Sequence, residues 1–263
     1  MRKFTGTLCF GLMILATSFT NAQNNRISSI ENIGWYNTFI TLKLSPKWAG
    51  YSEYQFRRVQ FISNWQQSLL RIGMQYQFSA NFLGRLGYGW IETFPYGEHP
   101  IDKWGKQFTE HRIFEMIQYN HQENRLNLIH RIMLEQRFVG VFADSTLTEE
   151  SSFPLLHRIR YLFKLEVPMA TFKTTGNALY ASFYDELFIG FGEHVQANIF
   201  DQNRIGCLIG FKWSDSFRIE LGYLNQIVQF GRQIESKSIF QYNHGFAINA
   251  IVNLDLARKT PKP

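Results

Sequence analysis

Charged side chains recur inside long alternating segments of this sequence, and they are the residues best placed to do chemistry. An arginine guanidinium binds a carboxylate through two parallel hydrogen bonds, so such residues can pair with one another or bind anions. Most of them share one parity of a segment with polar or small residues, while the other parity is apolar. The set is Glu53, Arg57, Arg71, Arg85, Arg131, Glu135, Arg137, Arg158, Arg160, Lys164, Glu166, Glu186, Arg204, Arg218 and Glu220.

Histidines are the obvious candidates for catalysis, because a serine nucleophile needs a histidine within reach and an acid to orient it. His130 lies among Leu, Ile, Tyr and Phe positions, with no serine that the spacing places beside it, and His244 has similar surroundings. Glu110-His111 and Tyr184-Asp185-Glu186 are predicted at extracellular strand ends, where they could bind a metal or act as acid and base. Structural hydrogen bonding at the rim is far more frequent. The sequence therefore predicts no catalytic residue.

Metal and cofactor motifs are missing as well. His99 and Asp102 share one connection, but two ligands do not make a zinc site. No metalloprotease, hydrolase, dithiol, phosphate-loop or dinucleotide motif occurs. We predict no metal and no cofactor. Tyr96, His99 and Trp104 either contact a ligand or fold their connection over neighbouring structure.

The first 22 residues have the anatomy of a secretory signal peptide. Two basic residues precede an apolar run at 8–16, and Thr20-Asn21-Ala22 offers small residues for cleavage before Gln23. The apolar run is too short to span a bilayer as a helix. We therefore assign residues 1–22 to a cleaved leader and expect the mature chain to be exported.

The mature chain is mildly basic and has one thiol. Removing the leader's two basic residues from the 27 in the chain leaves about 25 against 21 acidic residues, a net charge of about +4. The basic residues are scattered singly, without the block typical of nucleic-acid binding. Only Cys207 remains, so no intramolecular disulfide can form.

Alternation with a period of two predicts the elements that position the charged set. Eleven segments alternate in this way, and most run ten residues or more. A soluble sandwich strand averages about five or six residues, whereas a tilted strand crossing a bilayer needs about nine to eleven. The segments are 34–44, 48–61, 64–78, 82–94, 109–120, 125–138, 155–167, 177–188, 202–213, 217–229 and 238–254.

The connections alternate in length. Residues 45–47, 79–81, 121–124 and 214–216 are short, whereas 95–108, 140–154, 190–201 and 231–237 are longer and polar. Short periplasmic turns and long extracellular loops are typical of outer-membrane barrels. Aromatic residues near segment ends suit girdles at the two membrane interfaces: Trp35, Trp48, Phe82, Trp90, Trp213 and Phe217.

The predicted fold class is therefore all-β: a transmembrane antiparallel up-and-down β-barrel over residues 34–256. Bacterial single-chain barrels have even strand numbers, so the eleven segments predict about 12 strands, with 10 as the alternative. Residues 23–33 then either form a poor first strand or pass through the lumen. Residues 257–263 are a C-terminal tail.

Five runs stand out along the chain: Asn64-Trp65-Gln66-Gln67-Ser68-Leu69-Leu70-Arg71, Glu110-His111-Arg112-Ile113-Phe114-Glu115, Leu134-Glu135-Gln136-Arg137-Phe138, Tyr184-Asp185-Glu186 and Phe200-Asp201-Gln202-Asn203-Arg204. Taken together and in this order, they resemble one bacterial family, the domain of unknown function 2490. The resemblance spans nearly the whole mature chain and implies outer-membrane barrels, common in Bacteroidetes, with no established activity. It supplies no catalytic residues. Many barrels end on an aromatic residue, whereas this chain continues past its last predicted strand.

The charged set should line the lumen, because Arg or Lys on the lipid face near the midplane costs about 2–4 kcal/mol. Two interpretations remain open. A narrow barrel can fill its interior with a paired network, so that nothing passes, or an Arg-lined wall can form a pore that favours anions. Glycines at 73, 87, 89, 206, 210 and 222 either leave interior space or allow bending and close packing.

These patterns predict an integral outer-membrane protein of a Gram-negative bacterium, either structural or a narrow passive-diffusion pore (a porin) with an Arg-rich lumen. The alternative is an outer-membrane enzyme acting on lipid, a hydrolase or an acyltransferase. The expected partners are outer-membrane lipid and lipopolysaccharide, the barrel-assembly machinery, and small solutes or anions. No nucleic-acid partner is expected.

Overall fold

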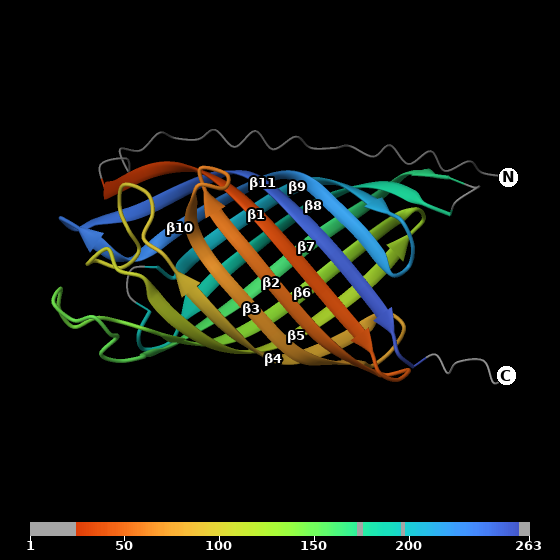
Figure 1. The fold of residues 1–263 in the computed structure, drawn as a ribbon, viewed down its shortest axis with the longest axis horizontal. Coiled ribbons are helices and arrows are strands. Elements are labelled where there is room, and N and C mark those ends of the chain that lie inside the picture. The colour runs from red at the N-terminus through yellow and green to blue at the C-terminus, as the bar shows by residue number, and fades with distance from the viewer. Residues whose placement is uncertain (1–24, 173–175, 196–197, 258–263) are drawn as a thin grey trace, which may run out of the picture.

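Eleven strands follow one another along the chain, and each is hydrogen-bonded to the next (Figure 1). The computed structural model describes residues 25–257 except 173–175 and 196–197, so the predicted leader and most of the predicted tail lie outside the described residues. No helix in the described part is long and apolar enough to cross a membrane. The strands are β1 (Arg26–Lys43), β2 (Trp48–Val59), β3 (Asn64–Gln77), β4 (Phe82–Thr93), β5 (Phe108–Glu123), β6 (Leu126–Val139), β7 (Leu155–Thr171), β8 (Ala178–Phe191), β9 (Phe200–Lys212), β10 (Phe217–Ile234) and β11 (Lys237–Asp255).

The sheet closes into a barrel by pairing its first and last strands. β1 and β11 run parallel, in register from Arg26↔Ser238 to Lys43↔Asp255, while every other neighbouring pair is antiparallel. An odd number of strands in an up-and-down sheet leaves the first and last strands pointing the same way, so closure must be parallel. Inside the barrel the side chain of Asn37 donates a hydrogen bond to that of Asn249 at 2.8 Å across this seam.

The described barrel has eleven strands, close to the expected twelve, because residues 26–33 do not form a separate element. They are the first part of β1, and their alternation continues without a turn into the segment predicted from residue 34. β11 is long enough to pair with all of β1, so these residues gain a partner along one edge without an additional strand. They do not pass through the lumen.

Long connections gather at one end of the barrel, which we call the loop end, and short turns occupy the other, the turn end. The connections 94–107 and 140–154 lie at the loop end, where β1 also begins. The expected loop over 231–237 is wrong, since β10 and β11 pair up to Ile234↔Lys237. Glu235 and Ser236 both adopt positive φ, the geometry of a two-residue hairpin, which Asn-Gly usually signals in a sequence.

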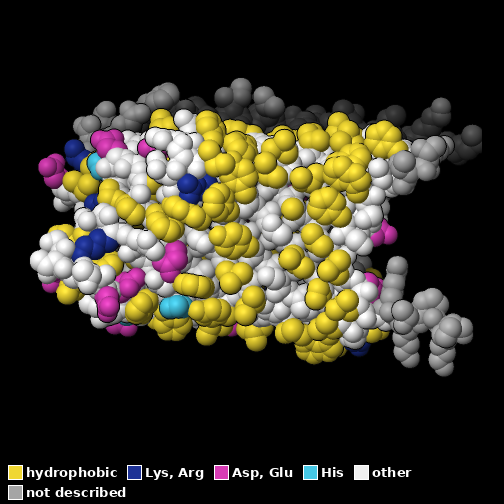
Figure 2. All heavy atoms as spheres, in the orientation of Figure 1, with side chains coloured by type: hydrophobic (Ala, Val, Ile, Leu, Met, Phe, Trp, Pro, Cys, Tyr) yellow, Lys and Arg dark blue, Asp and Glu magenta, His cyan; other side chains and the backbone are white. Residues whose placement is uncertain are grey.

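Burial is inverted relative to a soluble barrel. Outward side chains at the middle of strands are large and apolar, such as Ile72 (53% exposed) and Ile132 (51%), whereas inward Glu135 is 0% exposed. On the face shown in Figure 2, hydrophobic side chains cover most of the wall, and charged side chains gather near the loop end. The alternation that builds each strand therefore separates an apolar outer surface from a polar interior.

Of the aromatic residues predicted for the girdles, Trp48, Trp90 and Trp213 are exposed on the outer wall, but Trp35 is a correction. Trp35 is 4% exposed and points into the barrel, because it shares the inward parity of β1 with Ile33 and Asn37. Its indole Nε1 donates to the side-chain oxygen of Gln66 at 2.7 Å. Trp35 lies near the start of the predicted segment 34–44, which suggested a position at a membrane interface. β1 begins earlier, at Arg26, so the residue lies within the strand.

Parallel closure predicts a specific cross-link. In a Cys9→Ser, Cys207→Ser background, Thr38→Cys with Ala250→Cys should form a disulfide, because these residues are register partners on neighbouring strands. Thr38→Cys with Val252→Cys is the control, since its Cα atoms are about 8 Å apart across the seam. Electrophoresis without reductant measures both. Cross-linking of the control pair alone, or of neither, would contradict this closure.

Candidate functional site

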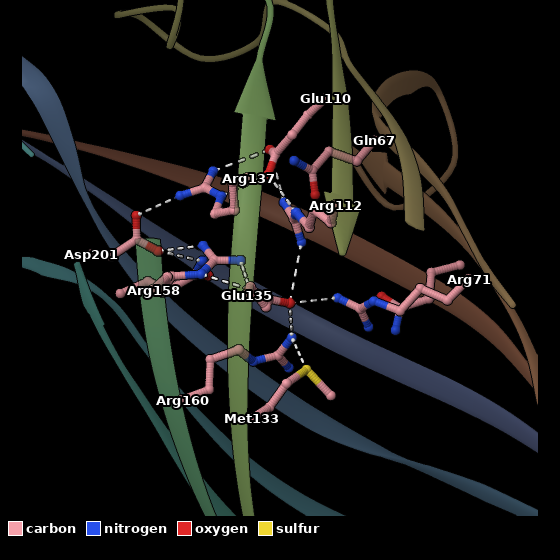
Figure 3. Close-up of polar contacts among 12 residues, drawn as sticks. Gln67, Arg71, Glu110, Arg112, Met133, Glu135, Arg137, Arg158, Arg160 and Asp201 are labelled. Carbon is pink, nitrogen blue, oxygen red and sulfur yellow. Dashed lines mark hydrogen bonds and ion pairs between the residues drawn. The ribbon is translucent and has the colours of Figure 1, made fainter. Parts of the chain in front are cut away.

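Glu135 lies at the centre of an ion-pair network inside the barrel (Figure 3). Its carboxylate, 0% exposed, faces four arginines: Arg158 Nε at 2.8 Å, Arg160 Nη1 at 2.7 Å, Arg71 Nη2 at 3.3 Å and Arg112 Nη1 at 3.7 Å. They come from β7, β3 and β5. Because a buried charge is costly unless it is paired, four donors around one carboxylate account for its burial.

Strand parity and register bring this cluster together. Glu135 shares the inward face of β6 with Met133 and Arg137, and Arg158 is its register partner on β7. Arg160 follows two residues later on the same face of β7, so both guanidinium groups reach one carboxylate. Alternation and the register of β6 with β7 therefore position three of the five charges.

Toward the loop end the network continues through two further carboxylates. Glu110, 1% exposed, binds Arg112 and also Arg137, whose Nε lies 2.6 Å from it. Asp201 lies 2.5 Å from Arg158 Nη1 and 3.6 Å from Arg137 Nη1. Figure 3 shows these arginines lying between carboxylates. Each carboxylate is therefore shared by two guanidinium groups.

Glu53 and Glu186 extend the network to other walls of the barrel. Glu53 binds Arg71 at 2.9 Å and accepts a hydrogen bond from the hydroxyl of Tyr51 at 2.6 Å. Glu186 lies 2.7 Å from Arg160 and 2.8 Å from Arg131. The arginines on Glu135 are thus also held by a second carboxylate.

A separate polar group lies closer to the turn end. The ammonium of Lys164 is 2.7 Å from Glu220 and 3.1 Å from Glu166, and Arg218 is 3.4 Å from Glu166. The hydroxyl of Tyr180 also donates to Glu220 at 3.0 Å. These contacts form a second polar layer.

Several of these contacts cross the lumen instead of following the wall. Arg71 on β3 reaches Glu135 on β6, and Lys164 on β7 reaches Glu220 on β10, although these strands are not neighbours. Arg71 and Arg160 are each 4% exposed. Cross-lumen pairs between side chains this deeply buried leave no wide aqueous passage at the level of Glu135.

All fifteen predicted lumen residues lie on inward parities, and thirteen join the ion pairs of the interior. Arg57 and Arg85 are the two that do not. Arg57 is held by the side chains of Gln55 and Gln67 and lies 3.9 Å from the centre of the Trp35 ring. Arg85 binds Gln75 and lies 3.3 Å from the Tyr51 ring. Aromatic faces and amides stabilise these two cations.

Sequence reasoning missed Glu110, Arg112 and Asp201 as interior residues. Glu110, predicted at the rim, is 1% exposed and points inward as the third residue of β5. Both parities of this strand carry apolar side chains, since Phe114 is buried inside while Ile113 is exposed outside. The charges at 110 and 112, two residues apart, were the available signal. Asp201 lies just before the predicted start of its strand.

Adjacent residues of a strand face opposite ways, and this separates the predicted acid–base candidates. Glu186 is inside, whereas Asp185 is exposed and accepts a hydrogen bond from Asn203 at 2.5 Å. His111 likewise faces outward while Glu110 faces inward. Neither sequence cluster therefore converges on one site.

The outward histidines bind tyrosines. His130 is 2.8 Å from the hydroxyl of Tyr161, and His244 is 2.9 Å from that of Tyr223. His111 pairs in the same way with Tyr88, at 2.6 Å, and His157 stacks on Phe191. Within the described chain no serine hydrogen-bonds to any of these four, and no group of three or more His, Cys, Asp or Glu residues could hold a metal.

Aromatic rings occupy the space beside several interior glycines. The rings of Tyr184 and Tyr180 lie directly over Gly206 and Gly210, where an added Cβ would overlap them. Phe114 covers Gly87 in the same way. These glycines therefore permit close packing of rings inside the barrel, as expected for glycine at close approaches in strands.

The connection 94–107 folds over the barrel mouth. Tyr96 on it is 9% exposed, and its hydroxyl accepts hydrogen bonds from Gln66 at 3.2 Å and Asn243 at 3.1 Å. Burial raises the pKa of the Tyr96 phenol above its usual value, so the group stays neutral. The indole of Trp104 donates to the carbonyl of Phe142 at 3.2 Å, which joins two loop-end connections.

These features define a class of protein: a closed β-barrel with an apolar outer wall and an ion-paired interior. Residues 32–235 match the family described as Protein of unknown function (DUF2490), and the chain belongs to this family. This agrees with the resemblance found in the sequence. Neither the curated proteins nor the solved structures give a match.

Removing the charge of Glu135 should destabilise the barrel strongly. Glu135→Gln leaves four buried arginines without their shared carboxylate, and breaking a buried ion pair costs about 3–5 kcal/mol. Glu115→Gln is the matched control, because Glu115 is exposed on the outer face of the neighbouring strand; its effect should stay below about 1 kcal/mol. Urea unfolding of the refolded proteins measures both free energies. Equal effects would show that the network does not stabilise the fold.

Proposed function

We propose that this protein is an integral barrel of the outer membrane of a Gram-negative bacterium, with a lumen closed by the ion-pair network around Glu135. In this proposal it is a structural, non-conducting barrel. The observation that carries it is the complete burial of the Glu135 carboxylate among four arginines from three strands.

Three features support a membrane location. The outer wall is apolar where strands are central, as at Leu86 (57% exposed) and Leu221 (54%). The strands run from 12 to 19 residues, long enough to cross a bilayer at a tilt. Full closure pairs the backbone groups of every strand with a neighbour, as hydrocarbon surroundings require.

The closed-lumen interpretation is favoured over an anion pore by the partners of the arginines. A selective anion pore presents its cations to the permeating solution. Here Arg71, Arg158 and Arg160 are 2–4% exposed, and each binds two carboxylates. Their charge is compensated inside the protein, which leaves little attraction for an ion in transit.

Membrane embedding makes a charge on the outer wall costly. Ile132→Arg, at the middle of β6, should weaken folding into lipid vesicles by about 2–4 kcal/mol. Ser214→Arg, in the turn between β9 and β10, should change it by less than about 1 kcal/mol. Folding titrations in vesicles compare the two with the unmodified protein. If Ile132→Arg folds as well as Ser214→Arg, that surface does not face lipid.

Conductance in a planar bilayer tests the closed lumen. The refolded, inserted protein should carry no steady current, because Arg71 reaches across the lumen to Glu135 and Arg160 binds the same carboxylate from the neighbouring strand. Arg71→Ala combined with Arg160→Ala should produce measurable channels, since both guanidinium groups are removed from the interior beside Glu135.

Arg218→Ala is the control for that experiment, because Arg218 lies nearer the turn end and its side chain is 31% exposed. It should remain silent. Steady anion-selective channels from the unmodified protein would overturn the non-conducting proposal and favour the pore.

A further inference from the structure

A cavity of about 540 Å³ lies at the loop end of the barrel, on the loop side of the Glu135 network. We call it the vestibule. Arg57, Arg112, Arg158 and Arg204 form much of its floor, and Lys103 lies at its rim. The floor is buried while Lys103 is exposed, so the cavity extends from the surface down to the arginines.

The lining carries more positive than negative charge. Seven of its residues are arginine or lysine, and three are aspartate or glutamate. Charges of one sign in a confined, low-dielectric space reinforce one another and attract counterions. Arg112 and Arg158 also belong to the Glu135 network, whose shared carboxylates compensate them, so the surplus lies on the other cations.

The surplus charge is concentrated on Arg57 and Arg204. Arg57 is 2% exposed, binds the neutral amides of Gln55 and Gln67, and has no carboxylate within ion-pair distance in the described chain. Arg204 binds the amide oxygen of Gln202 at 3.0 Å, and its nearest carboxylate is 3.8 Å away.

Both of these cations lie against one aromatic ring. The Trp35 ring centre is 3.9 Å from the guanidinium carbon of Arg57 and 4.9 Å from that of Arg204. Ring contacts stabilise a cation weakly and do not neutralise it. Arg57, held by amides and the ring, and Arg204, whose one carboxylate lies 3.8 Å away, are therefore preorganised to accept an anion.

The walls of the vestibule are partly apolar, so a ligand that fits it should have an apolar part. Phe108 and Phe230 line it and are 7% and 3% exposed. A volume of about 540 Å³ suits a small organic molecule. The closed floor makes this a site of binding from the loop end, not a passage.

We propose that the vestibule binds a small organic anion, with its phosphate or carboxylate group against Arg57 and Arg204 and its apolar body against Phe108 and Phe230. Guanidinium groups bind either anion through paired hydrogen bonds. A soluble compound and the headgroup of a lipid carry the same anionic group, and the same contacts serve both.

Calorimetric titration of the full, refolded chain with phenyl phosphate tests the proposal. Saturable binding is expected, with weaker binding of inorganic phosphate, which lacks the apolar body, and none of neutral benzyl alcohol. Arg57→Gln should weaken phenyl phosphate binding about tenfold or more, the loss expected for a charged hydrogen-bond partner.

Arg85→Gln is the matched control. Arg85 is also held by a glutamine and an aromatic ring, but it does not line the vestibule. It should bind phenyl phosphate like the unmodified protein. If Arg57→Gln does not fold, Lys103→Glu at the exposed rim should still weaken binding severalfold.

A parallel titration with dihexanoyl phosphatidic acid distinguishes the two sources. Tighter binding than phenyl phosphate, lost in the Arg57 variant, identifies a lipid headgroup, and the reverse order identifies a soluble anion. The proposal is overturned if phenyl phosphate does not saturate the protein, or if Arg57→Gln, once folded, binds it as tightly as Arg85→Gln does.

Discussion

The cost of burying the Glu135 carboxylate is the constraint on which the interior depends. An unpaired charge in such surroundings is strongly unfavourable, so the arginines must come to it from across the lumen. Each of the four is also bound to another carboxylate, as Arg71 is to Glu53 and Arg160 to Glu186. The result is a connected set of charges that joins non-neighbouring strands and fills the space between them.

The pairing of buried charges differs between the centre of the barrel and its loop end. Around Glu135 the arginines are compensated by carboxylates that they share. Toward the loop end the carboxylates become fewer, and Arg57 and Arg204 are held by amides and the Trp35 ring. An interior that is neutralised at its centre and positive at one mouth is suited to hold an anion from one side without conducting it.

The alternation of apolar and polar residues made the strands and most of the inward charges predictable from the sequence. Each of the eleven strands overlaps one predicted segment, although several run further, because a wall with apolar residues on one side and charge on the other needs a strict period of two. The parity of Arg131 and Glu135 likewise indicated the inward face. The pattern failed where both faces carry apolar residues, which hid Glu110 and Arg112 on β5, and at Trp35, whose type suggested an interface.

The sequence by itself determined the fold class, the strands and most of the inward charges, since these follow from local alternation and from the cost of exposing charge to an apolar environment. Only the tertiary structure decided how the barrel closes and which charges meet. Parallel pairing of β1 with β11 depends on the number of strands that complete the circle. The contacts of Glu135 join strands that are distant in sequence, and register and barrel diameter, not spacing along the chain, bring them within reach.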